Sequence, residues 1–106
     1  MIATLLEVRG VRHTVLVSPA GEVVASAGMS EAQMSSELGL VAAGRAVIGS
    51  LQSQMAAESW QEIVLDVDDG PVLLTQHGDQ VLLTAFDDVA NLGRVRFAVR
   101  KLLGLA

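Results

Sequence analysis

Hydrophobic positions along the chain change their period several times, and each change predicts a new element of secondary structure. Short runs rich in β-branched residues are separated by turn sequences such as Pro19-Ala20-Gly21 and His77-Gly78-Asp79. Two longer stretches have helical character, and Ser30 and either Asp87 or Asp88 stand where N-caps are expected. The first predicted element is a short helix around Leu5, Leu6 and Val8 that ends at Gly10, and strands 13–18 and 22–26 follow it. A long helix is then predicted from Glu31 to about Ala57. Strands 60–67, 72–76 and 80–86 come next, and a last helix runs from Val89 to about Leu103.

This order, α-β-β-α-β-β-β-α, predicts an α/β fold of the α+β type in which residues 1–106 form one domain. Short connections between consecutive strands favour antiparallel pairing, with helices on the faces of the sheet. In strand 60–67, Ile63, Leu65 and Val67 share one face.

The central helix is unusual because almost none of its surface is charged. At 100° per residue its side chains divide into three lanes. The first lane is bulky and apolar, is interrupted by Arg45 and Gln52, and contains Met34, Leu38, Val41, Ile48 and Met55. The second lane is also apolar and contains Leu40, Val47 and Leu51. The third lane lies between them and contains only small residues: Ser35, Gly39, Ala42, Ala46, Gly49, Ser53 and Ala57. A helix that is apolar nearly all round is buried on more than one side. It packs either on its own sheet alone or, as its length of roughly 40 Å favours, also against a helix of a partner.

Composition supports burial by a partner. Hydrophobic side chains make up 51% of the chain and charged ones 18%, whereas soluble domains usually have about 25% charged residues. The least charged stretch, 38–57, contains Arg45 and several polar residues, which argues against membrane insertion. We therefore expect a protein partner to cover the excess apolar surface.

Charge and cysteine content exclude further classes. The net charge of −5 argues against nucleic-acid binding, because phosphates require a basic face. The absence of cysteine excludes disulfides and thiolate metal sites. The first residues lack the basic and apolar segments of a secretory signal, so we expect a cytoplasmic location.

No motif predicts catalysis, a metal or a cofactor. Residues 39–46 resemble a phosphate-binding loop, but Arg45 and Ala46 replace the lysine and the hydroxyl residue, and the stretch lies inside a helix. Residues 66–70 resemble the start of a calcium loop, whose sixth and twelfth positions are here Pro71 and His77. We predict a non-enzymatic protein with no catalytic, cofactor-binding or metal-binding residues.

The last helix carries a second candidate surface. Its stretch 94–101 has four basic residues and no acidic one. Leu92, Val95, Val99, Leu102 and Leu103 are expected to face the core, and Phe97 the opposite side. The outer face is either a solvated surface whose cations suit a helix C-terminus or a partner contact through Arg94, Phe97 and Lys101.

The chain resembles the Roadblock/dynein light chain family from about Leu5 to Leu103. The resemblance is carried by residues 10–11, 15–25 (VLVSPAGEVVA), the long helix, 72–74, 81–83 and 90–96 (ANLGRVR). It implies a profilin-like, five-stranded antiparallel sheet with strand 60–67 at an edge, and a homodimer formed by that strand and the long helix. Bacterial relatives often act with Ras-like small GTPases, eukaryotic relatives belong to dynein and GTPase-regulating complexes, and none is similar to an enzyme. The opening helix is shorter here than in many family members.

We therefore predict a homodimeric module that regulates or scaffolds a Ras-like small GTPase. The candidate dimer residues are Ser35, Leu38, Gly39, Ala42, Arg45, Ala46, Gly49, Ser53, Trp60, Ile63, Val64 and Leu65. Arg45 either contacts the partner or forms a salt bridge with a carboxylate such as Glu37. The alternative function is a small-molecule sensor, which requires a sizeable pocket with convergent polar groups.

Overall fold

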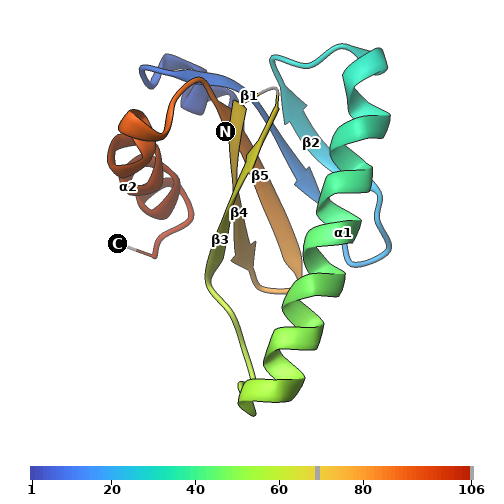
Figure 1. The fold of residues 1–106 in the computed structure, drawn as a ribbon. Coiled ribbons are helices and arrows are strands. Elements are labelled where there is room, and N and C mark those ends of the chain that lie inside the picture. Colours follow the sequence, from blue (N-terminus) through green and yellow to red (C-terminus); the bar gives the residue numbers. More distant parts are fainter. Residues whose placement is uncertain (69, 106) are drawn as a thin grey trace.

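A computed structural model describes residues 1–68 and 70–105, and Figure 1 shows a central sheet between two helical layers. The elements are the 3₁₀ helix η1 (Ile2–Glu7), β1 (Val11–Val17), β2 (Val23–Ala27), α1 (Glu31–Met55), β3 (Glu62–Val67), β4 (Gly70–His77), β5 (Gln80–Phe86), the 3₁₀ helix η2 (Val89–Asn91) and α2 (Leu92–Leu102). The strands pair antiparallel in the order β2-β1-β5-β4-β3. The predicted five-stranded antiparallel sheet, the element order and the edge position of the 60–67 strand are confirmed.

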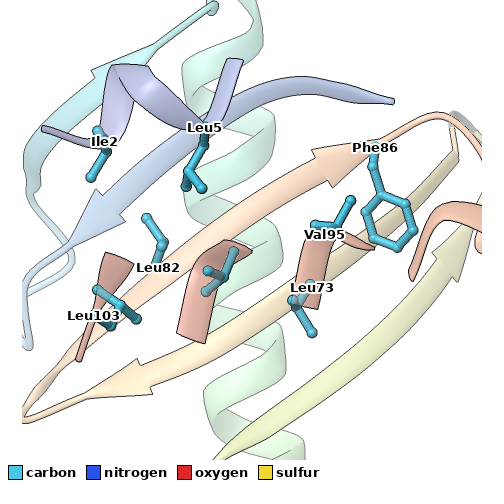
Figure 2. Close-up of a cluster of buried hydrophobic side chains, with 8 residues drawn as sticks. Ile2, Leu5, Leu73, Leu82, Phe86, Val95 and Leu103 are labelled. Atoms are coloured by element: carbon cyan, nitrogen blue, oxygen red, sulfur yellow. The ribbon is translucent and has the colours of Figure 1, made fainter. Parts of the chain in front are cut away.

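The two faces of the sheet carry separate cores, because side chains alternate along each strand. On one face η1 and α2 cover the sheet, and Figure 2 shows the cluster of Ile2, Leu5, Leu73, Leu82, Phe86, Val95, Val99 and Leu103. On the other face Val41 of α1 packs with Val15, Val17, Val72, Leu74, Val81, Leu83 and Ala85. The predicted inward face of the last helix is confirmed, and so is the outward position of Phe97.

Helix α1 begins where predicted and ends two residues early. The Ser30 hydroxyl accepts the Gln33 N–H, and the Gln33 side chain accepts the Ser30 N–H, so a capping box fixes the first turn. At the other end Ala56 adopts the left-handed conformation with φ 56°, and the Ala57 N–H donates to the Gln52 carbonyl. This closure ends the helix at Met55 rather than at Ala57.

The terminal helical segments differ from the prediction in kind. The opening segment is a 3₁₀ helix that buries Ile2 and Leu5. Asp88 rather than Asp87 provides the later cap, accepting the Ala90 N–H at 2.8 Å, and the resulting 3₁₀ turn delays the start of α2 to Leu92.

Strand boundaries shift by small amounts. The first strand spans 11–17 rather than 13–18, the second 23–27 rather than 22–26, the third begins at 62 rather than 60, and the fourth spans 70–77 rather than 72–76.

Within the described residues, no helix combines the length and the apolar character needed to cross a membrane.

Candidate interaction surface

Helix α1 crosses the sheet with its backbone nearest to β1 and β5, and the side chain of Leu74 on β4 reaches it from below. Gly44 is buried at this crossing, and a Cβ built there would overlap the side chain of Leu74. Val41 and Ile48, one turn away on either side, are also buried. A side chain at position 44 would therefore require Leu74 to move. The sequence prediction did not distinguish this glycine from the other glycines of the helix.

A groove of about 610 Å³ opens between the first half of α1 and the sheet. Its floor includes His13, Ala85 and Val72, which are neighbours across β1, β5 and β4. Val67 and Asp68, at the end of β3, line the same groove. Its helical wall consists of Ala32, Gln33, Ser36, Glu37, Gly39, Leu40 and Ala43. The small residues of this wall recur at i, i+4, i+7 and i+11, so they mark one flank of the helix.

One polar contact joins the helical wall to the floor. The His13 Nε2 lies 3.1 Å from Glu37 Oε2, and His13 is only 6% exposed. Arg12 lies nearby against Gly70, where φ is 118° and a Cβ would come within 2.9 Å of the Arg12 Nη1. With Asp68, these side chains place two basic and two acidic groups around the groove.

Arg45 contacts the end of β1. Its Nη1 donates to the Ser18 carbonyl at 2.9 Å and its Nη2 to the Val17 carbonyl at 3.4 Å. Of the two alternatives for Arg45, the salt bridge with a carboxylate such as Glu37 is wrong, because Arg45 bonds backbone carbonyls and Glu37 contacts His13. Eight residues of helix separate the two side chains by about 12 Å along the axis, which explains why they do not meet.

The groove-side flank continues into the second half of α1 as exposed apolar residues. Val47 and Leu51 follow Ala43 by one and two turns and are 50% and 47% exposed. Beside the groove, β3 is the last strand of the sheet, and its Val64 and Val67 are exposed as well. We name this surface the β3-side flank of α1: Ala32, Ser36, Gly39, Ala43, Val47 and Leu51. The fold thus leaves an uncharged helix flank next to an unpaired strand edge.

The predicted dimer residues fall into distinct groups. Ser35, Ala42, Ala46, Gly49 and Ser53 are all exposed on α1, and we name them the outward lane. This lane lies about 100° around the helix from the β3-side flank. Gly39 lines the groove, Val64 is exposed on β3, and Leu38, Trp60, Ile63 and Leu65 are half-buried against the core under α1. Ala32, Ser36 and Ala43 also line the groove but were not among the predicted residues, although their helical spacing places them on one flank.

The described residues bring together no group of three or more His, Cys, Asp or Glu side chains that could hold a metal ion. What the fold defines is a small α+β domain with a long helix on one face of its sheet, shorter helices on the other, and an uncovered helix-and-strand surface. The Roadblock/LC7 domain family model matches residues 1–87, and the chain belongs to this family.

Solved structures share the fold at low sequence identity. Myxococcus xanthus MglB is 23% identical, with a TM-score of 0.82 and coverage of 96% of this chain and 85% of that one. The gliding protein MglB from Thermus thermophilus is 24% identical, with a TM-score of 0.77 and coverage of 94% and 77%. A Roadblock/LC7 domain from Streptomyces avermitilis is 19% identical, with a TM-score of 0.73 and coverage of 97% and 93%. No curated protein matches the chain.

Proposed function

We propose that this chain is a non-catalytic cytoplasmic module that forms a homodimer and regulates or scaffolds a Ras-like small GTPase. The observation that carries the proposal is the bare β3-side flank of α1 next to the unpaired edge of β3. The family resemblance supports the GTPase, because bacterial relatives often act with such proteins.

A two-fold axis beside Ala43 would cover both surfaces at once. Each β3 would pair antiparallel with its copy, and the two α1 helices would run antiparallel across the axis. Helix positions whose numbers sum to about 86 would then face each other, so Gly39 meets Val47 and Ser36 meets Leu51 of the second copy. Small residues face large ones, and the second half of each helix fills the groove beside the first half of the other.

The energetics require both parts of this interface. Covering Val47 and Leu51 in each copy, which are half-exposed in the protomer, supplies roughly 3–5 kcal/mol of apolar burial. Association costs at least about 4 kcal/mol in lost translational and rotational freedom. The helix contact alone therefore falls short of a stable dimer, and pairing of the β3 edges has to contribute.

Measurement of mass in solution tests the dimer. Light scattering at micromolar concentration should give twice the mass of the chain, and Leu51→Asp should give a monomer because the contact would bury an unpaired carboxylate. Val24→Asp is the matched control, since Val24 is 51% exposed on the opposite sheet edge, β2. A monomeric wild type, or a dimer that tolerates Leu51→Asp, contradicts the proposed interface.

Pairing through the β3-side flank would leave the outward lane free. The two lanes, uncharged and small, would run antiparallel over one face of the dimer and together form the surface that receives the GTPase. Single-turnover GTP hydrolysis and pull-down with the Ras-like small GTPases of the same organism test that surface. Ala46→Glu should weaken binding without changing the mass of the dimer. A dimer that binds no such GTPase contradicts this part of the proposal alone.

A small-molecule sensor is the second candidate, favoured by the groove itself. Its volume of about 610 Å³ lies within the range of small-ligand sites, and Arg12, His13, Glu37 and Asp68 line it. Thermal shift against a metabolite panel distinguishes the two functions. A ligand that stabilises the wild type supports the sensor, whereas one that stabilises only Leu51→Asp indicates that a second copy normally fills the groove.

A further inference from the structure

We infer that the outer face of α2 is a separate interaction surface, which binds an acidic helix of a partner protein. The surface consists of Arg94, Phe97 and Lys101, and we name it the α2 outer face. It lies on the opposite side of the sheet from α1 (Figure 1), so it stays free in the proposed dimer. The inference therefore does not depend on the proposed function.

The three side chains share one side of the helix. At 100° per residue, Arg94, Phe97 and Lys101 lie within roughly 60° of one another. Val95 and Val99 occupy the opposite side and are fully buried. Phe97 is 64% exposed, whereas Phe86, the other phenylalanine of the chain, is fully buried. Aromatic residues and arginine are enriched at protein interfaces, so an exposed phenylalanine between two cations is a suitable anchor for a partner.

The two cations of this surface are not neutralised by direct ion pairs within the described residues. Arg94 Nη1 donates to Asn91 Oδ1, and the Asn91 amide donates to Asp87 Oδ1 at 2.8 Å, which orients the guanidinium through a neutral side chain. The Lys101 ammonium forms no hydrogen bond or ion pair with the residues that the structure describes, although the Lys101 backbone carbonyl accepts the Gly104 N–H.

The other cations of α2 are already engaged. Arg96 forms an ion pair with Glu62 of β3, and Arg100 donates to the Leu105 carbonyl. Their contacts draw them towards the rest of the protomer, so Arg94 and Lys101 are the charges available to a partner.

Charge selects the class of partner. The stretch 94–101 has four basic residues and no acidic one in a chain of net charge −5, so it forms a local positive surface that favours an acidic ligand. An anionic membrane fits less well, because an amphipathic helix inserts its apolar face into lipid. On α2 that face, formed by Val95, Val99 and Leu103, lies in the core.

Spacing narrows the partner further. Seven residues separate Arg94 from Lys101, which places their Cα atoms about 10 Å apart along the axis. Two carboxylates at positions i and i+7 of a partner helix have the same separation, and an apolar side chain at i+4 would lie between them, over Phe97. The fitting ligand is therefore an acidic helix with this pattern.

A designed peptide provides the probe. The ¹⁵N-labelled full chain is titrated with a helical peptide that carries Glu, Leu and Glu at i, i+4 and i+7, and with the same peptide in which Gln replaces both Glu residues. We expect the acidic peptide to shift the amide resonances of α2, and Phe97→Ala and Lys101→Glu each to weaken its binding about tenfold. Added salt should weaken it as well, because the contacting charges are exposed.

Matched variants keep the test specific. Arg9→Glu makes the same change of charge at an exposed cation outside α2 and should retain most of the affinity. Leu51→Asp should bind the peptide like the wild type, which separates this surface from the dimer. The inference is overturned if the peptide shifts no α2 resonance, if the Gln peptide binds equally well, or if Phe97→Ala and Lys101→Glu bind normally. Binding of anionic lipid vesicles by the wild type, without binding of the peptide, would overturn it too.

Discussion

Gly44 of α1 and Leu74 of β4 meet where the long helix crosses the sheet, and the Leu74 side chain occupies the space that a side chain at position 44 would need. Leu74 is itself buried between neighbouring strands and the helix, so it has little room to move. A glycine that is unfavourable for helix formation therefore leaves room for the Leu74 side chain beneath α1.

We predict that Gly44→Ala destabilises the protein although alanine is the better helix former. Overpacking against Leu74 should lower the free energy of unfolding by about 1–2 kcal/mol after the gain in helix propensity is counted. Gly49→Ala is the matched control, because nothing beyond the local helix backbone lies within 4 Å of its added Cβ, and it should raise the free energy of unfolding by about 0.5–1 kcal/mol. Urea unfolding measures both. An equal increase in the free energy of unfolding in the two variants would contradict the tight contact between Gly44 and Leu74.

The sequence was sufficient to predict the order of the helical segments and strands, but not that the opening segment and the start of the last one are 3₁₀ helices. Turn residues separate runs with distinct periods, and each short connection restricts its strands to antiparallel pairing. Boundaries were less predictable where one residue overrides local preference. Ala56, for example, ends α1 in a left-handed conformation that alanine rarely adopts, and no residue type at that position indicates it.

The contact between His13 and Glu37 is predicted to stabilise the first half of α1 on the sheet. Glu37→Ala would leave a buried imidazole without its partner and should lower the free energy of unfolding by about 1–3 kcal/mol. Glu37→Gln keeps an acceptor oxygen, so its free energy of unfolding should fall by less than that of Glu37→Ala. Glu58→Ala, at an exposed acidic residue beyond the helix, should have little effect. Chemical denaturation of the three variants checks this order of stabilities. An unchanged free energy of unfolding in Glu37→Ala would show that the contact does not stabilise the fold.

Arg45 is predicted to act on folding rather than on a partner. Its guanidinium bonds the Ser18 and Val17 carbonyls, so Arg45→Ala should lower the free energy of unfolding by about 1–2 kcal/mol. Binding of the GTPase, measured at a temperature where the variant is folded, should be unchanged. Normal stability combined with lost GTPase binding would instead favour the partner contact that the sequence left open.

The flank that we propose faces a second copy could not be chosen from the sequence. Helical periodicity gives the angles between the lanes of α1, but it does not say which lane faces the edge of the sheet. That orientation follows from tertiary contacts: Gly44 against Leu74, Glu37 against His13, and Arg45 against the end of β1. Together they turn Ala43 towards the groove and leave Ala42 on the outward lane.

Cysteine cross-linking distinguishes these two lanes directly, because the natural chain contains no cysteine. Ala43→Cys lies beside the proposed two-fold axis, where the Cα atoms of facing small residues can approach to roughly 4.4–6.8 Å, the range that a disulfide spans. We predict that mild oxidation converts this variant to a covalent dimer on non-reducing gels. Gly39→Cys combined with Val47→Cys should also cross-link, since these positions face each other only between copies.

The controls are Ala42→Cys and Gly49→Cys on the outward lane, which should remain monomeric on the same gels. These positions point about 100° away from the β3-side flank, so their sulfur atoms would be held apart in the proposed dimer. Cross-linking at 42 or 49 but not at 43 would show that the two α1 helices contact each other through the outward lane rather than through the β3-side flank. Absence of cross-linking at every position, in a protein that light scattering shows to be dimeric, would exclude α1 from the interface and leave the β3 edge as the site of pairing.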